Sequence, residues 1–182
     1  ELGLAFIDQV DGAYLKSLPP LQLFHRGHGR RVVNVIHGDT EEVAITIFGY
    51  RYRTGGGNNS QSHAQTVILF NSQQLQLPHF EMRPEGFFHK IGQAFGGKDI
   101  DFASHPNFSN AFLLKGKDEA AVRALFTSEL LDFLQEKPGI SIEGFGNHLI
   151  CYRASKRVNP EQVRSFMEDG FVVFQKFLEA QS

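Results

Sequence analysis

The sequence is poor in several residue types, and each shortage excludes a class of protein. Its 182 residues include one cysteine, Cys151, which excludes an intramolecular disulfide framework and a cysteine-clustered zinc site. No stretch approaches the roughly 18 apolar residues that a membrane-spanning helix needs. The 18 Lys and Arg nearly balance the 20 Asp and Glu, for a formal net charge of -2. This balance lacks the electrostatic footprint of a nucleic-acid-binding protein, so we expect no nucleic acid among the partners.

Apolar residues are abundant enough to form a folded core. Tryptophan is absent and methionine occurs only 2 times, but phenylalanine occurs 18 times, and 41% of the residues are hydrophobic. Such a composition offsets the entropy cost of ordering the chain and excludes intrinsic disorder. The length suits one compact domain. We therefore predict a single globular domain over residues 1–182, in which the N-terminal segment 1–24 lies against the core.

The first half of the chain has the composition of β-strands. β-branched and aromatic residues alternate with polar ones, and glycine-rich or polar turns separate the runs. The segment 54–62 contains three consecutive glycines between two such runs and has no lysine, so it indicates a hairpin tip and not a phosphate-binding loop. The pattern predicts an antiparallel meander of four strands, at 31–37, 42–53, 63–70 and 77–83.

The second half alternates helical and extended patterns. Pro84 stands where a helix could begin, with apolar residues at helical spacing as far as Phe95. Asp118 is a candidate N-cap for a helix over 119–137, and Asn159-Pro160 precedes a final helix. Short strands are expected at 112–115, 140–143 and 149–153. The predicted fold class is α+β, with a mainly antiparallel sheet and about three helices, two of them long and C-terminal.

One irregular segment, 98–106, combines the residue types that active sites use. It holds Asp99, Asp101 and His105, and Lys90 lies shortly before it, so these four residues form a candidate polar site. The segment lacks the Gly-x-Ser-x-Gly motif of a hydrolase and the acidic spacing of an EF-hand. Roles in turns and helix caps are the alternative interpretation, and no residue is assigned as catalytic.

A second candidate lies among the basic residues before the first strand. Arg26, Arg30 and Arg31 flank two histidines, and their positive charges would repel a metal cation. The same charges could bind a phosphate or a lipid headgroup, which makes the three arginines a candidate anion site. A solvated turn is the alternative. We expect no metal site and no cofactor, and we expect Cys151, in an apolar strand, to be a buried thiol.

Motifs are spread along nearly the whole chain, at 2–6, 23–35, 48–55, 65–67, 88–92 and 99–102. Together they resemble a family of uncharacterised bacterial proteins. The resemblance implies an N-terminal membrane helix, a basic linker and then this domain, and it carries no assigned activity. Since the chain begins at Glu1 and not at methionine, we expect such a helix upstream, with the domain on the cytoplasmic side of the inner membrane.

Two classes of function follow from these observations. The first is a non-enzymatic binding or interaction domain of a membrane-anchored bacterial protein, whose partner is another protein, a small ligand or the membrane surface. The second is an enzyme, such as a hydrolase, that acts through residues 99–105. The first is favoured, because no nucleophile, base and orienting group are indicated together. The sequence does not indicate an oligomeric state.

Overall fold

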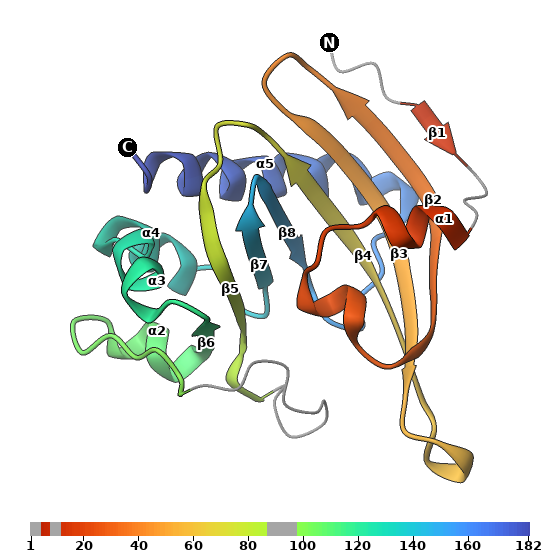
Figure 1. Cartoon of the computed structure of the whole chain (residues 1–182), viewed down its shortest axis with the longest axis horizontal. Helices are drawn as coiled ribbons and strands as arrows, with labels where there is room; N and C mark the ends of the chain where they lie inside the picture. The colour runs from red at the N-terminus through yellow and green to blue at the C-terminus, as the bar shows by residue number, and fades with distance from the viewer. Residues whose placement is uncertain (1–4, 8–11, 87–97) are drawn as a thin grey trace.

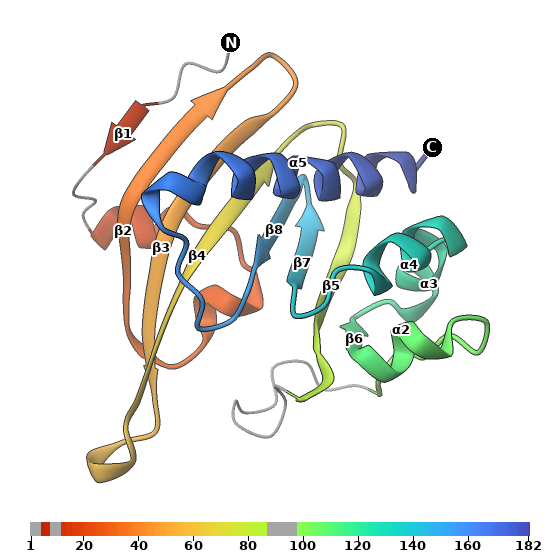
Figure 2. The same cartoon turned by 180° about the vertical axis from the view of Figure 1, so that it is seen from behind.

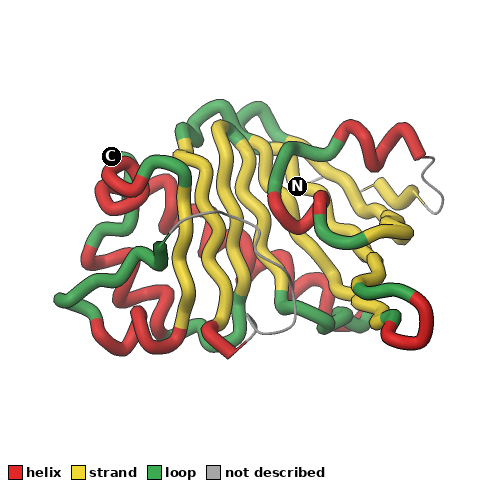
Figure 3. Tube along the Cα trace, turned by 60° about the horizontal axis from the view of Figure 1, so that its bottom comes forward, coloured by secondary structure: helices red, strands yellow, loops and turns green. Residues whose placement is uncertain are grey.

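The computed structural model describes residues 5–7, 12–86 and 98–182, and its framework is one antiparallel sheet of eight strands (Figures 1 and 3). The strands lie in the order β1-β2-β3-β4-β8-β7-β5-β6, and every neighbouring pair is antiparallel. The predicted α+β class is thereby confirmed. The strands are β1 (Ala5–Ile7), β2 (His28–Asp39), β3 (Ala44–Thr54), β4 (Gln61–Asn71), β5 (Leu77–Pro84), β6 (Phe112–Gly116), β7 (Ser141–Gly146) and β8 (His148–Tyr152).

The predicted meander is wrong at one point, because β4 and β5 are not neighbours. The hairpin of β7 and β8 is inserted between them, so that β4 pairs with β8 and β5 pairs with β7. Residues 149–152 of β8 are all buried, which is typical of a strand in the middle of a sheet with both faces covered.

Helix α5 (Val163–Glu179) covers one face of the sheet, as Figure 2 shows, and confirms the predicted C-terminal helix. A short 3-10 helix, Pro160–Gln162, precedes it. Phe174 stacks on Phe70 of β4 with ring centroids 5.0 Å apart. Gly170 allows the close approach, because a Cβ at this position would lie only 3.1 Å from side-chain atoms of Ile68. The helix is therefore packed tightly on the centre of the sheet.

The helix predicted over 119–137 is broken into α3 (Glu119–Leu125) and α4 (Ser128–Gln135). Asp118 caps α3 as expected, by accepting a hydrogen bond from the Ala121 amide at 3.0 Å. Thr127 has an extended backbone and caps α4 by accepting from the Leu130 amide at 3.3 Å. This second cap ends the first helix, so α5 is the one long helix among the described residues.

A further helix, α2 (Pro106–Ala111), forms where the sequence indicated irregular structure. It contributes the buried Phe108, whose ring centroid lies 6.1 Å from that of Phe126. Helices α2, α3 and α4 lie together beside the β5–β6 end of the sheet (Figure 2). The helix expected after Pro84 lies mostly outside the described residues, and the structure ends β5 at Pro84 itself.

The opposite face of the sheet is covered by the chain before β2 (Figure 1). Helix α1 (Gly12–Ser17) and a 3-10 helix, Gln22–His25, cross this face, and Leu21, Leu23 and Phe24 are buried there. Within the N-terminal segment, residues 21–24 thus lie against the core, whereas β1 is exposed and α1 has no buried residue. The apolar partners of residues 21–24 on the sheet are Val32, Phe48, Tyr50, Tyr52, Val67, Leu69, Ile150 and Tyr152.

The hairpin tip at 54–62 and the burial of Cys151 agree with the sequence pattern. The glycine-rich segment forms the tip of the β3–β4 hairpin and contains one turn of 3-10 helix, Gly57–Asn59. The side chain of Cys151 is buried. Within residues 5–7, 12–86 and 98–182, no helix combines the length and the apolarity needed to cross a membrane.

Candidate functional site

The described residues of the candidate polar site, Asp99, Asp101 and His105, have different neighbours. The Asp99 carboxylate accepts a hydrogen bond from the Leu114 amide at 2.8 Å, and Asp101 is exposed. His105 lies 2.9 Å from the Ser104 hydroxyl and 3.4 Å from the Asp132 carboxylate. Burial raises the pKa of Asp99, and the Leu114 amide partly offsets this rise. Since Lys90 lies outside the described residues, a hydrolase site in this segment stays a prediction.

The three arginines of the candidate anion site lie on two different faces of the sheet. The Arg30 guanidinium donates to the Phe24 carbonyl at 2.8 Å, on the face that the N-terminal segment covers. Arg26 is buried on that same face and forms an ion pair with Glu81. Arg31 is exposed, and its neighbour Val32 points to the covered face, so Arg31 points to the α5 face. The structure therefore separates Arg31 from the other two arginines.

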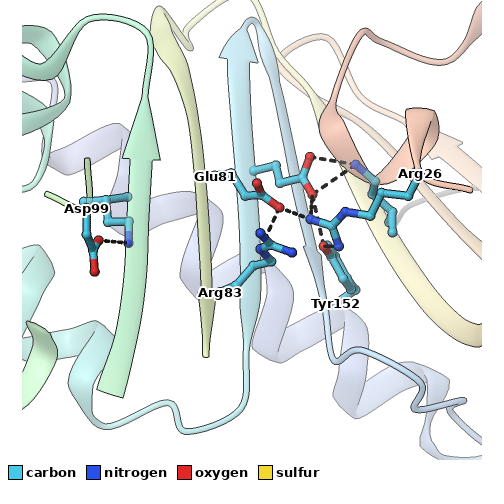
Figure 4. Close-up of polar contacts among 8 residues, drawn as sticks. Arg26, Glu81, Arg83, Asp99 and Tyr152 are labelled. Carbon is cyan, nitrogen blue, oxygen red and sulfur yellow. Dashed lines mark hydrogen bonds and ion pairs between the residues drawn. The ribbon is translucent and has the colours of Figure 1, made fainter. Parts of the chain in front are cut away.

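Four charged side chains and a tyrosine meet in the interior of the described chain (Figure 4). We call this group the buried charge cluster: Arg26, Glu81, Arg83, Glu143 and Tyr152. Glu81 and Glu143 are each 0% exposed, Arg83 is 2% exposed and Arg26 is 7% exposed. Because two positive charges meet two negative ones, the cluster has no formal net charge at neutral pH.

Strand alternation brings these side chains together. Glu81 and Arg83 are two residues apart on β5, so they point to the same face, and Glu143 of β7 lies directly across from Glu81. Tyr152 comes from β8. Arg26 reaches the group from the chain that crosses this face (Figure 4). Three strands and one loop thus contribute to the cluster.

The contacts within the cluster are continuous. The Arg26 guanidinium pairs with Glu81, lies 3.5 Å from a Glu143 oxygen and donates to the Tyr152 hydroxyl at 3.2 Å. That hydroxyl donates to Glu143 at 3.0 Å, and Arg83 Nε lies 2.9 Å from Glu81. The Leu23 amide also donates to both Glu143 oxygens, at 3.1 and 3.2 Å. Glu143 therefore binds the backbone of the N-terminal segment as well as its arginine.

Burial and the neighbouring charges shift the ionisation of the cluster. Burial alone would lower the pKa of Arg26, but the adjacent Tyr152, Glu143 and Tyr52 raise it above its ordinary value. Burial together with the charge of Arg26 lowers the pKa of Arg83 to about 10. Burial also raises the pKa of Tyr152. Both arginines thus carry their charge at neutral pH, and the tyrosine stays protonated.

This cluster is suited to holding the fold together and not to covalent chemistry. Glu81 is ion-paired with the two buried arginines, and Glu143 accepts hydrogen bonds from Leu23 and Tyr152. Removing any one charge would leave another unbalanced away from water. A buried thiol, Cys151, lies on the opposite face of the sheet, and burial raises its pKa, which disfavours the nucleophilic thiolate. Among the residues that the structure describes, no group of three or more His, Cys, Asp or Glu side chains could hold a metal ion.

The buried charge cluster was not predicted, although the sequence contains a signal for it. Glu81 and Arg83 alternate with Phe80 and Met82, and Glu143 follows Ile142 in a largely apolar run. A charged residue on one face of a strand whose other face is apolar is either exposed or paired in the interior. The sequence does not show which, because it does not reveal whether that face is covered.

Comparison with known proteins shows a likeness of fold. No family model matches the chain, and no curated protein matches its sequence. Among solved structures, the crystal structure of the mycobacterial trehalose monomycolate transport factor A, TtfA, superposes with a TM-score of 0.64 at 13% sequence identity. The match covers 98% of this chain and 86% of that one. At 13% identity this likeness establishes a shared fold. The expected relationship to bacterial proteins is thereby supported at the level of the fold.

Proposed function

We propose that this chain is a non-enzymatic binding domain that serves the transport of a lipid across a bacterial cell envelope. The observation that carries the proposal is the shared fold with a trehalose monomycolate transport factor, which extends over 98% of the chain. A likeness of this extent includes the sheet, the helix that crosses it and the segment on its other face. Fold alone does not fix function, so the transport role is our inference.

The nature of the buried charge cluster supports a binding role over a catalytic one. A catalytic site needs a reactive group that a substrate can reach, with a base and an orienting group beside it. Here the buried charge cluster is shielded from water, balanced in charge and bonded to the backbone of Leu23. Its evident effect is to fix the N-terminal segment on the sheet and to keep that face rigid.

We also propose that the domain works beside the cytoplasmic face of the inner membrane, behind an upstream membrane helix. In such an arrangement, the anchor would be followed by β1 at the edge of the sheet and then by residues 12–26, which the bonds to Glu143 hold on the sheet face. Fractionation of cells that express the complete reading frame tests this location. Recovery of the full-length protein in the soluble fraction, or a reading frame without an apolar segment, would contradict it.

The transport role is tested in the bacterium that encodes the chain. Lipids are pulse-labelled with radioactive acetate in the wild type and in a gene deletion, and the inner and outer fractions of the envelope are compared. We expect one labelled lipid to accumulate in the inner fraction while its total synthesis is unchanged. An unchanged distribution would contradict the proposal. A loss of synthesis, in place of a loss of transfer, would indicate an enzyme.

A complementation variant separates binding from hydrolysis. The double substitution Asp101→Asn/His105→Gln removes the acid–base chemistry of the candidate polar site while keeping the size of both side chains. Asp101 is exposed, so the fold should tolerate the change. This variant should restore the lipid distribution as well as the wild-type gene does. If it fails although the protein accumulates normally, the hydrolase hypothesis is favoured.

A further inference from the structure

An open groove lies on the α5 face of the sheet, away from the buried charge cluster. It has a volume of about 500 Å³ and runs between strands β2–β4 and the segment 157–163 that leads into α5. Its size falls in the range of small-molecule sites. One part of its wall is apolar and is formed by Phe6, Val33, Ile36, Ile47 and Val163.

The floor of the groove changes from apolar to basic along a single strand. Ile47, Gly49 and Arg51 are successive same-face residues of β3, and all three line the groove. Arg157 lines it from the loop above the sheet. Among the described lining residues none is acidic, and neither arginine forms an ion pair with any acidic residue in the described ranges. The groove is therefore amphipathic, with a positive end.

A third arginine strengthens the positive end. Arg31 of β2 is the direct cross-strand partner of Arg51, so both side chains project from the same face. Like charges directly opposite each other on paired strands are destabilising. Both arginines are exposed. An anion bound between the two guanidinium groups would relieve this repulsion. A surface of mixed charge would have no such repulsion to relieve.

We propose that this groove binds one molecule of a single-chain anionic lipid. Its carboxylate or phosphate lies between Arg51, Arg157 and Arg31, and its acyl chain lies along Val33, Ile36 and Ile47. Arginine suits the head because its planar guanidinium binds carboxylate and phosphate through two hydrogen bonds. The inference rests on the proposed function for the class of ligand. Binding is measured on the purified protein and transport in the cell, so either can fail without the other.

The site differs from the anion site expected from the sequence. It retains Arg31, adds Arg51 and Arg157, and omits Arg26 and Arg30, which lie on the other face of the sheet. The bulge in β2 contributes to its shape, because Asn34 has a φ of 53° and the register with β3 shifts between Val33 and Ile36. The extra residue keeps both Val33 and Ile36 in the wall of the groove.

The test is isothermal titration of the purified chain with dodecyl phosphate below its micelle concentration. We expect saturable one-to-one binding. Inorganic phosphate should bind at least 100-fold more weakly, and a neutral detergent with the same chain at least 10-fold more weakly. Decyl phosphate, which is two methylenes shorter, should bind about 15-fold more weakly, because each buried methylene contributes roughly a factor of four.

Variants locate the binding. Arg51→Gln should weaken the binding of dodecyl phosphate about tenfold and leave the binding of the neutral detergent unchanged. The control is Lys117→Gln, which removes an exposed charge elsewhere and should change neither affinity. Ala64→Phe should block both ligands, because Ala64 lines the groove and is the cross-strand partner of Arg51. Circular dichroism melts check that each variant is folded.

Three results would overturn the inference. The first is equal affinity of the wild type and Arg51→Gln for dodecyl phosphate. The second is tight binding of inorganic phosphate, which would make the ligand a free anion. The third is binding to anionic phosphatidylglycerol vesicles without binding to soluble dodecyl phosphate, which would indicate a membrane-surface contact.

Discussion

Replacing Glu143 by glutamine should destabilise the folded chain by about 3–5 kcal/mol. Its carboxylate is fully buried and accepts hydrogen bonds from the Leu23 amide and the Tyr152 hydroxyl, and Arg26 lies 3.5 Å away. Glutamine keeps the shape and one acceptor oxygen but removes the negative charge. The two arginines of the cluster would then face only Glu81, and one buried positive charge would have no counter-charge. The expected loss follows from this imbalance.

Urea unfolding followed by circular dichroism measures the effect. A change of this size corresponds to a fall in melting temperature of about 6–20 °C for a domain of this length. The exposed Glu41→Gln is the matched control, and it should stay within about 0.5 kcal/mol of the wild type. A loss below about 1 kcal/mol for Glu143→Gln would show that water reaches the cluster and would refute the reasoning.

A double-mutant cycle separates the charge imbalance from general disruption. Arg26→Met and Glu143→Leu are made singly and together, so that the double variant removes one charge of each sign. Its destabilisation should be smaller than the sum of the single losses by at least about 1 kcal/mol, because neither charge is then left unbalanced. Simple additivity would mean that the two side chains do not interact.

Three further predictions concern other parts of the chain. Phe126→Ala should lower the free energy of unfolding in urea by about 3–5 kcal/mol, because the ring is 2% exposed. Phe133→Ala should lower it clearly less, because Phe133 is partly exposed, and equal losses would contradict this assignment. Burial and the nearby charge of Arg26 lower the pKa of His63, so the unfolded chain binds its proton more readily. The free energy of unfolding should therefore fall as the pH drops below about 6.5, and less steeply in His63→Gln, whereas parallel pH profiles would exclude this residue as a cause. Burial raises the pKa of Cys151, so a thiol reagent should modify it only at the rate of unfolding, and fast labelling of the native chain would contradict its burial.

Local signals in the sequence were sufficient for most individual elements. The β-branched runs, the glycine-rich tip at 54–62, the Asp118 cap and the helix after Pro160 all appear where the pattern indicated them. These signals act within one or two turns of chain, through backbone preferences, capping bonds and the alternation of apolar residues. The burial of Cys151 follows in the same way from its position in an apolar strand.

The helix break at Thr127 marks the limit of such signals. The apolar stripe continues across it, so periodicity alone predicted one helix. Thr127 competes by capping the next turn, and the ring of Phe126, just before it, lies 5.9 Å from that of Phe177 in α5. Packing against a distant helix thus favours the break, and a helical pattern does not report such a partner.

Tertiary structure decided the order of the strands. It also decided which charged residues form the buried charge cluster and which form the positive end of the groove. Nothing local to β4 or β5 indicates that a hairpin from much later in the chain will lie between them. That insertion places Glu143 beside Glu81 and buries a charge cluster that the sequence shows only as scattered residues. Pairing of β2 with β3 likewise sets Arg31 against Arg51 while Arg26 turns to the other face. The residue types fix which groups are available, but which charges meet, and whether water reaches them, depends on contacts between segments far apart in the chain.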